Sequence, residues 1–194
     1  MLKITGGDLR GRTVLTPPDD KTRPSGAKVR QALYNSIQMR TADARVLDLF
    51  AGSGALGFEA LSRGARHVCF AENWKVALKC LDQNISTLKV KEQVQVIRED
   101  ILSPAFNKKL DFEIQKDGLF DLVLADPPYA DDWEMKLLNF FPWEKVMVPG
   151  GLFFLEWGAV KSKVESLPDQ TPFLVKVREK NYGDTWLTTF ERKS

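Results

Sequence analysis

From residue 45 onward, short apolar runs alternate with amphipathic segments. The apolar runs predict strands at Val46–Phe50, His67–Ala71, Val94–Arg98, Leu119–Ala125 and Gly151–Glu156. Segments with helical spacing predict helices at Ala55–Arg63, Trp74–Leu88 and Trp133–Phe140, and a less regular stretch precedes Leu119. Phe173–Glu179 and Thr185–Arg192 are typical of a final antiparallel pair. This alternation predicts a Rossmann-like α/β sandwich, with a mostly parallel sheet covered on both faces.

The first 40 residues follow a different pattern. Two short segments, Leu2–Thr5 and Thr13–Leu15, flank a glycine-rich turn and predict a hairpin. Ser25 is expected to cap the helix that follows. The apolar stripe of that helix is Val29, Leu33 and Ile37. The pattern divides the chain into an N-terminal hairpin-and-helix appendage, residues 1–40, and a larger domain, residues 41–194.

Length and composition limit the classes of function. The 194 residues suffice for one well-buried domain and a small appendage. The sequence has no apolar run of the roughly 18 residues that a membrane span needs. The first twelve residues lack the apolar core of a signal peptide, so we expect a cytoplasmic protein. With one histidine and two cysteines, a Cys/His zinc cluster is excluded and no metal is expected.

The charge is unevenly distributed along the chain. The net charge is +2, yet residues 1–45 hold nine Lys and Arg against four Asp. A basic segment at residues 1–45, joined to a slightly acidic remainder of the chain, favours contact with a polyanion such as RNA. The alternative is that these side chains merely pack the appendage against the sheet. The residues expected to contact RNA are Arg10, Arg12, Arg23, Lys28 and Arg30.

A glycine-rich loop closes the first strand of the larger domain. Gly52, Gly54 and Gly57 match the G-x-G-x-x-G pattern, and Glu72 follows the next strand. This spacing fits a dinucleotide site as well as an S-adenosylmethionine site. Asp48 at the strand end would repel a pyrophosphate but can pair with the ammonium of a methionine moiety. The expected cofactor-binding residues are Asp48, Phe50, Ala51, Gly52, Gly54, Glu72, Asn73, Asp100 and Ile101.

The segment Asp126-Pro127-Pro128-Tyr129 directly follows an apolar strand and carries the most specific chemistry. The prolines stiffen the backbone, so the Asp126 carboxylate and the Pro127 carbonyl can each accept one N–H of a planar amine. Two fixed acceptors aim the lone pair of that amine at a methyl group. Tyr129 would stack on the base. We therefore expect these four residues to be catalytic in the methylation of an exocyclic amine.

With these motifs, the chain resembles the bacterial guanine-N2 methyltransferases of small-subunit (16S) ribosomal RNA. The resemblance rests on residues 7–12, 22–24, 29–35, 46–64, 126–129 and 182–185. It implies a class I methyltransferase sandwich with a seven-stranded, mostly parallel sheet and an antiparallel final strand. It also implies a guanine presented in assembled or partly assembled small subunits. Departures from the family pattern are Asn73-Trp74 after Glu72, and Asn84-Ile85-Ser86.

Other functions stay open at the level of the sequence. The same motif serves DNA adenine or cytosine amino-methyltransferases and protein glutamine methyltransferases, although no segment resembles a target-recognition domain. The glycine loop also fits a nicotinamide-binding oxidoreductase. A non-catalytic RNA-binding protein that keeps the fold is a further alternative.

Overall fold

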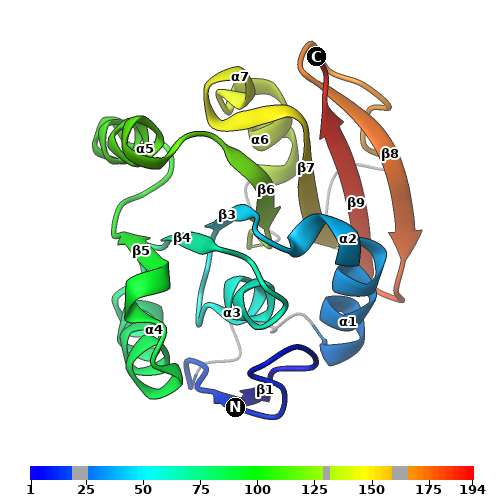
Figure 1. Ribbon diagram of the computed structural model, residues 1–194. Coiled ribbons are helices and arrows are strands. Elements are labelled where there is room, and N and C mark those ends of the chain that lie inside the picture. The colour runs from blue at the N-terminus through cyan, green and yellow to red at the C-terminus, as the bar shows by residue number, and fades with distance from the viewer. Residues whose placement is uncertain (19–25, 129–131, 159–165) are drawn as a thin grey trace.

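The computed structural model describes residues 1–18, 26–128, 132–158 and 166–194. The strands of its main sheet are β3 Arg45–Leu49, β4 His67–Ala71, β5 Val94–Ile97, β6 Phe120–Ala125, β7 Met147–Gly158, β8 Leu174–Asn181 and β9 Thr185–Arg192. Within the described residues these seven strands lie in the order β5-β4-β3-β6-β7-β9-β8 (Figure 1). The strands from β5 to β7 in this order pair in parallel, and β9 runs antiparallel to both of its neighbours. The predicted Rossmann-like sandwich with an antiparallel final strand is confirmed.

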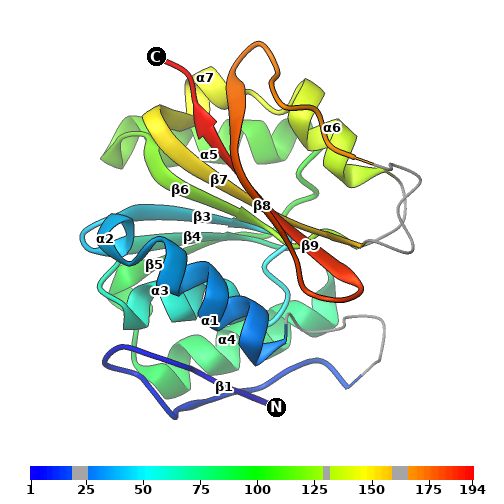
Figure 2. The ribbon, with the colours of Figure 1, turned by 90° about the vertical axis from the view of Figure 1, so that its right-hand side faces the viewer.

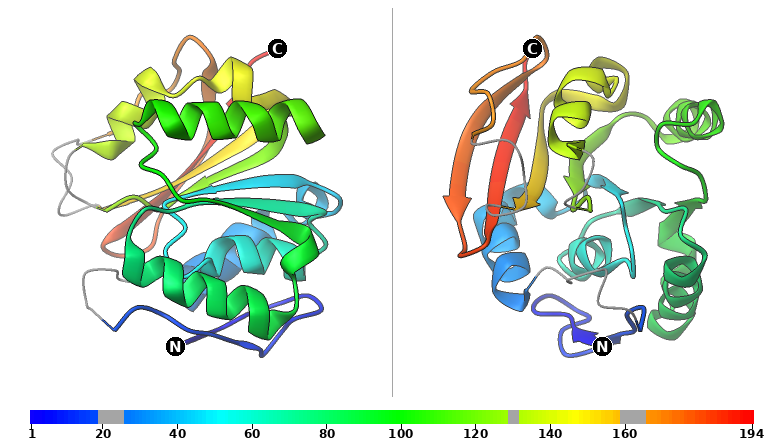
Figure 3. Two further views of the ribbon diagram at one scale, coloured as in Figure 1. Left: turned by 90° about the vertical axis from the view of Figure 1, so that its left-hand side faces the viewer. Right: turned by 180° about the vertical axis from the view of Figure 1, so that it is seen from behind.

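Helices cover both faces of the sheet (Figure 2). One face carries α1 Ala27–Ser36, α3 Ala55–Ser62 and α4 Lys75–Leu88, and the other carries α5 Pro104–Asp117, α6 Trp133–Phe140 and α7 Trp143–Val146 (Figure 3). Successive residues of β3 point to opposite faces, so Val46 and Leu47 belong to different core clusters and both are fully buried. Short connecting elements are α2 Gln38–Thr41 and η1 Lys91–Gln93. None of the described helices is long and apolar enough to cross a membrane.

The N-terminal appendage shares a core with the larger domain. Its strands β1 Leu2–Lys3 and β2 Thr13–Val14 pair antiparallel, which confirms the hairpin. The predicted stripe of α1 is buried, although the expected cap Ser25 lies outside the described residues and Gly26 precedes the helix. Ile4, Val14 and Leu33 join the cluster that packs under α3. The division of the chain at residue 40 stays a prediction.

The stretch before β6 was expected to be irregular, and this expectation was wrong, because α5 occupies most of it. Ser103 caps the helix, its Oγ accepting a hydrogen bond of 3.0 Å from the Phe106 N–H, and Pro104 stands in the first turn. Gly118 ends the helix with φ +92°. The exposed Phe112 obscures the apolar stripe of α5, so the Ser-Pro start and the glycine stop were the better signals.

Strand β7 begins at Met147, four residues before the expected start. Pro149-Gly150 reads as a turn in the sequence, and Gly150 does adopt φ +73°. The chain nevertheless stays in the sheet, because the irregularity is absorbed by a register shift between the pairs Phe120–Met147 and Leu122–Leu152. A local turn signal was therefore overridden by strand pairing.

Candidate active site

Four parallel strands end together at one edge of the sheet. Leu49 of β3 pairs with Ala71 of β4 and with Ala125 of β6, and Ala71 pairs with Ile97 of β5. The residues that follow these strand ends therefore gather there, as ligand-binding groups do in open α/β sheets. In this way the fold brings together the glycine loop, Glu72, Asp100 and Asp126, which are far apart in the sequence.

The glycine loop between β3 and α3 is held in left-handed backbone conformations. Phe50, Gly52 and Gly54 have φ of 57°, 56° and 83°. Gly54 N–H donates to the Ala51 carbonyl at 2.7 Å, and Ala51 N–H donates to the Ala71 carbonyl of β4 at 3.0 Å. A positive φ is unusual for a residue as bulky as phenylalanine and marks strain of the kind found at binding sites. The Phe50 ring meets Trp133 of α6 edge-on, with ring centroids 4.9 Å apart.

Glu72 shapes the loop from the end of β4. Its Oε2 accepts the Gly52 N–H at 2.7 Å. Its Oε1 accepts the N–H groups of Asn73 at 2.9 Å and Trp74 at 2.8 Å, at the start of α4. The half-buried carboxylate thus fixes two chain segments at the strand edge. Acceptors at this place suit the vicinal hydroxyls of a ribose.

Asp48 is the last residue but one of β3 and is 1% exposed. Its Oδ2 accepts the Gly57 N–H of α3 at 2.9 Å. Burial raises the pKa of Asp48 to about 7, the Gly57 hydrogen bond opposes the rise, and the negative charge of Glu72 adds to it. A buried carboxylate with a raised pKa is stabilised in its charged form by a cation, so this position suits a ligand that carries an ammonium group.

Asp100 and Asn73 meet across the ends of β4 and β5. Asp100 Oδ1 accepts the Leu102 N–H at 2.8 Å, and its Oδ2 accepts a longer bond of 3.4 Å from Asn73 Nδ2. Both side chains are exposed, whereas Ile101 beside them is buried. An apolar side chain next to exposed polar groups provides the two kinds of contact that a purine ring needs.

The expected catalytic segment leaves the sheet beside the glycine loop. Asp126 is half-buried, Pro127 buried and Pro128 exposed, directly after the last residue of β6. Because Leu49 pairs with Ala125, Asp126 and Phe50 leave adjacent strands at the same level. Tyr129 lies outside the described residues. The catalytic assignments stay predictions. The end of β6 lies beside the glycine loop, which is the position that these assignments require.

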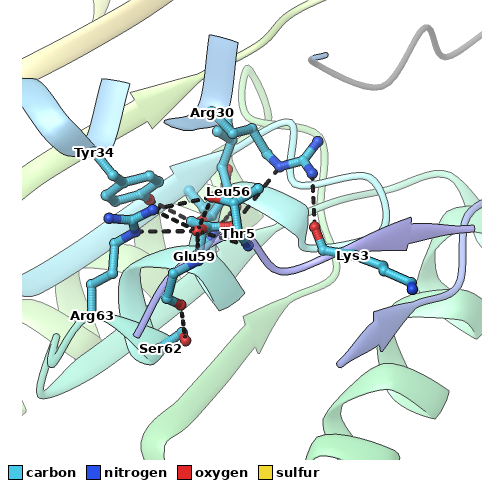
Figure 4. A network of polar contacts seen from close by, with 11 residues as sticks. Lys3, Thr5, Arg30, Tyr34, Leu56, Glu59, Ser62 and Arg63 are labelled. Carbon is cyan, nitrogen blue, oxygen red and sulfur yellow. Dashed lines mark hydrogen bonds and ion pairs between the residues drawn. The ribbon is translucent and has the colours of Figure 1, made fainter. Parts of the chain in front are cut away.

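The appendage is fastened to α3 by a buried polar cluster around Glu59 (Figure 4). The Glu59 carboxylate, 0% exposed, accepts the N–H groups of Thr5 and Gly6 at 2.9–3.1 Å and pairs with Arg63 at 3.0 Å. Arg30 donates to the Lys3 carbonyl at 3.1 Å and lies 4.0 Å from Glu59. Removing one partner from such a cluster costs about 3–5 kcal/mol, because it leaves a buried charge without compensation.

The basic residues of the appendage therefore fall into two groups. Arg10, Arg12 and Lys28 are exposed, although Arg12 also donates to the Thr87 carbonyl at 2.9 Å. Arg30 is 1% exposed, so its guanidinium belongs to the Glu59 cluster and we remove it from the expected RNA-contacting surface. Arg23 lies outside the described residues.

Sequence reasoning overlooked two side chains at the site. Trp133 contacts the ring of Phe50, whose backbone φ is positive, and Asn84 of α4 donates from Nδ2 to the Ser53 carbonyl of the glycine loop at 3.0 Å. Asn84 is 1% exposed. An asparagine in the middle of an amphipathic helix, on its buried side, was the signal available in the sequence.

Comparison with known proteins identifies the family of this chain. The family model described as conserved hypothetical protein 95 matches residues 2–191. The ribosomal RNA small subunit methyltransferase D of Escherichia coli K12 is 30% identical over 100% of this chain and 91% of its own length. The enzyme of that name from Haemophilus influenzae is 34% identical over 80% of this chain and 78% of its own. The solved structure of Escherichia coli yhhF gives a TM-score of 0.79 at 29% identity, covering 99% of this chain and 98% of that one. The chain belongs to the conserved hypothetical protein 95 family and is a relative of these small-subunit ribosomal RNA methyltransferases.

Proposed function

We propose that this protein transfers a methyl group from S-adenosylmethionine to the exocyclic N2 amine of a guanine in small-subunit ribosomal RNA. The observation that carries the proposal is the meeting of the Asp126-Pro127-Pro128 strand exit with the glycine loop at one sheet edge. Its relatives are named as methyltransferases of small-subunit ribosomal RNA, which supports methyl transfer over the nicotinamide-dependent alternative.

The residues at the sheet edge fit the functional groups of S-adenosylmethionine. Asp48 would stabilise the ammonium group, Glu72 would accept the ribose hydroxyls, and Asp100 with Ile101 would contact the adenine. The left-handed backbone of Gly52 and Gly54 permits close approach of the ligand. When bound, S-adenosylmethionine supplies an electrophilic methyl group.

The protein's own contribution to the reaction is to hold the amine. The lone pair of a guanine N2 amine is delocalised into the ring, which makes the amine a poor nucleophile. The Asp126 carboxylate and the Pro127 carbonyl would each accept one N–H and so direct the lone pair at the methyl group. The Asp126 carboxylate can also receive the proton that the amine releases. Orientation of this kind contributes up to about 7–11 kcal/mol of the barrier.

The substrate would reach this edge as an unpaired base. Duplex RNA hides its base edges, so the guanine would lie in a loop or be flipped toward Asp126. The exposed Arg10, Arg12 and Lys28 of the appendage would bind flanking phosphates. The natural substrate would be an assembled or assembling small subunit.

Nucleoside analysis tests the proposal directly. The protein is incubated with S-adenosylmethionine and, separately, with unmodified small-subunit RNA, with small subunits from a strain lacking the gene, and with DNA. After digestion, N2-methylguanosine is the expected product from the RNA or the subunits. A methylated adenine or cytosine would contradict the guanine assignment. Absence of any transfer despite cofactor binding would favour a non-catalytic RNA-binding protein.

A further inference from the structure

Asn84 joins the N-terminal appendage and the glycine loop through a single side chain. It lies on α4, and its Nδ2 donates to the carbonyls of Ser53 at 3.0 Å and Leu15 at 2.9 Å. Its Oδ1 accepts the Leu15 N–H at 2.8 Å. Leu15 directly follows β2 of the appendage, and Ser53 stands between two glycines of the loop.

The chemistry of these three bonds requires an amide. A carboxamide offers two N–H donors and one carbonyl acceptor, and all of these groups are used here. Alanine would make none of these bonds, and serine is too short to reach both chain segments. Asparagine is also an unfavourable residue inside a helix, so its presence at a 1% exposed position is best explained by these contacts.

The loop is held from both of its sides. Glu72 accepts the Gly52 N–H at 2.7 Å, and Asn84 donates to the carbonyl of the next residue, Ser53. The Glu72 contact comes from the sheet edge, whereas the Asn84 contact comes from α4 through an amide that also bonds Leu15. A shift of the appendage at Leu15 would therefore act on the peptide group between Ser53 and Gly54.

We propose that Asn84 is a positioning residue that couples the appendage to the glycine loop, so that RNA on the appendage and cofactor in the loop raise each other's affinity. The inference rests on the proposed function, since it needs both ligands. RNA that fixes the appendage fixes Leu15, and through Asn84 it favours the loop conformation that receives the cofactor. Because linkage is reciprocal, one factor describes both effects.

Binding calorimetry with S-adenosylhomocysteine measures this factor without turnover. The dissociation constant is determined for the full chain, alone and saturated with unmodified small-subunit RNA transcript. For the wild-type protein we expect binding at least about five-fold tighter with RNA, the lower end of ordinary coupling factors. For Asn84→Ala the ratio should fall to about one, while each ligand still binds on its own. Asn84→Ser serves if the alanine variant does not fold.

Ser62→Ala is the matched control. Ser62 is 2% exposed, and its Oγ accepts the Leu9 N–H at 2.9 Å and donates to the Gly6 carbonyl. It fastens the appendage to the end of α3 that is farther from the loop, so its removal should leave the coupling ratio unchanged.

The possible results separate the coupling from the proposed function. A wild-type ratio in the Asn84 variant would overturn the inference, as would a ratio of one in a wild-type protein that binds both ligands. In both cases the proposed function would stand. A wild-type protein that fails to bind S-adenosylhomocysteine or the RNA would overturn the proposed function and the coupling together.

Discussion

At the scale of single residues, we expect Asp48 to make cofactor binding depend on pH. Its pKa is about 7 in the folded protein, raised by burial from an ordinary value of 3.8. A carboxyl with a raised folded pKa favours the folded state at low pH, and this contribution is lost as the pH rises through about 7. A cationic ligand reverses this balance, because it stabilises the carboxylate.

We therefore expect S-adenosylhomocysteine to bind more tightly as the pH rises through about 7. If binding requires the charged carboxylate, the affinity at pH 6 should be about ten-fold below that at pH 8. Calorimetry across this range measures the effect. Asp48→Asn should bind weakly with a flatter profile, and a wild-type profile that is flat would show that Asp48 does not face the ligand's charge.

Asp126 is expected to act on the amine and not on the cofactor. Asp126→Ala should abolish methyl transfer while the dissociation constant for S-adenosylhomocysteine stays within a few-fold of the wild-type value. Asp126→Asn keeps one acceptor oxygen and should retain part of the activity. Turnover near the wild-type rate in the alanine variant would remove Asp126 from the catalytic residues.

The sequence predicts the positions of the site residues better than it predicts their contacts. The positions of Asp48, Glu72 and Asp126 at one edge were predictable, because Glu72 and Asp126 each follow an apolar run, Asp48 lies near the end of another, and parallel strands end together. The contacts that these side chains make in the structure were not predictable. Glu72 contacts Gly52 through the loop conformation after β3, and Asn84 contacts Leu15 through the placement of α4, and no local pattern specifies either.

At the scale of elements, strong periodicity was a reliable guide and weak periodicity was not. β4 and α6 have the predicted bounds, whereas α5 was missed because Phe112 faces solvent and masks the apolar stripe. β7 begins four residues before the predicted start, because the strand continues through Pro149-Gly150. For β7, strand pairing overrode a local turn signal, whereas for α5 the Ser-Pro start and the glycine stop were local signals that the apolar pattern outweighed.

The contact between α3 and β4 gives a prediction at this scale. A Cβ on Gly57 would lie 2.3 Å from Phe70 Cε1 and 2.8 Å from Val68 Cγ1, inside the core. Gly57→Ala should therefore cost about 1–3 kcal/mol through overpacking. For a chain of this size, each kcal/mol lowers the melting temperature by about 2–4 °C.

Gly26→Ala is the control for this substitution. Gly26 has φ −54°, and no atom lies within 4 Å of a Cβ built there. Because Gly26 is the N-cap of α1 and alanine is less favourable there, its alanine variant should lower the free energy of unfolding by no more than about 1 kcal/mol. If Gly57→Ala is equally harmless, α3 does not press on β4 as closely as the structure places it.

At the scale of the whole molecule, the two sides of the sheet are covered by different groups of helices. The appendage, α1, α3 and α4 lie on one side, and α5 to α7 lie on the other (Figure 2). The exposed Arg10 and Arg12 belong to the first side, while the lysines Lys108 and Lys116 of α5 belong to the second. The net charge of +2 does not indicate which of these sides binds RNA. The contribution of the charges on each side must therefore be measured separately.

The salt dependence of RNA binding distinguishes the two sides. Each protein cation that binds a phosphate releases counterions, so the affinity falls with salt in proportion to the number of phosphates bound. Arg10→Ala combined with Arg12→Ala should flatten the log–log slope by about 0.7–0.9 for each phosphate that the variant no longer binds, with cofactor binding unchanged. Lys108→Ala combined with Lys116→Ala removes the same charge from the opposite side and should leave the slope unchanged. Equal slopes for the arginine double variant and the wild-type protein would place the RNA elsewhere, whereas a flatter slope in the lysine variant alone would place it on the face of α5.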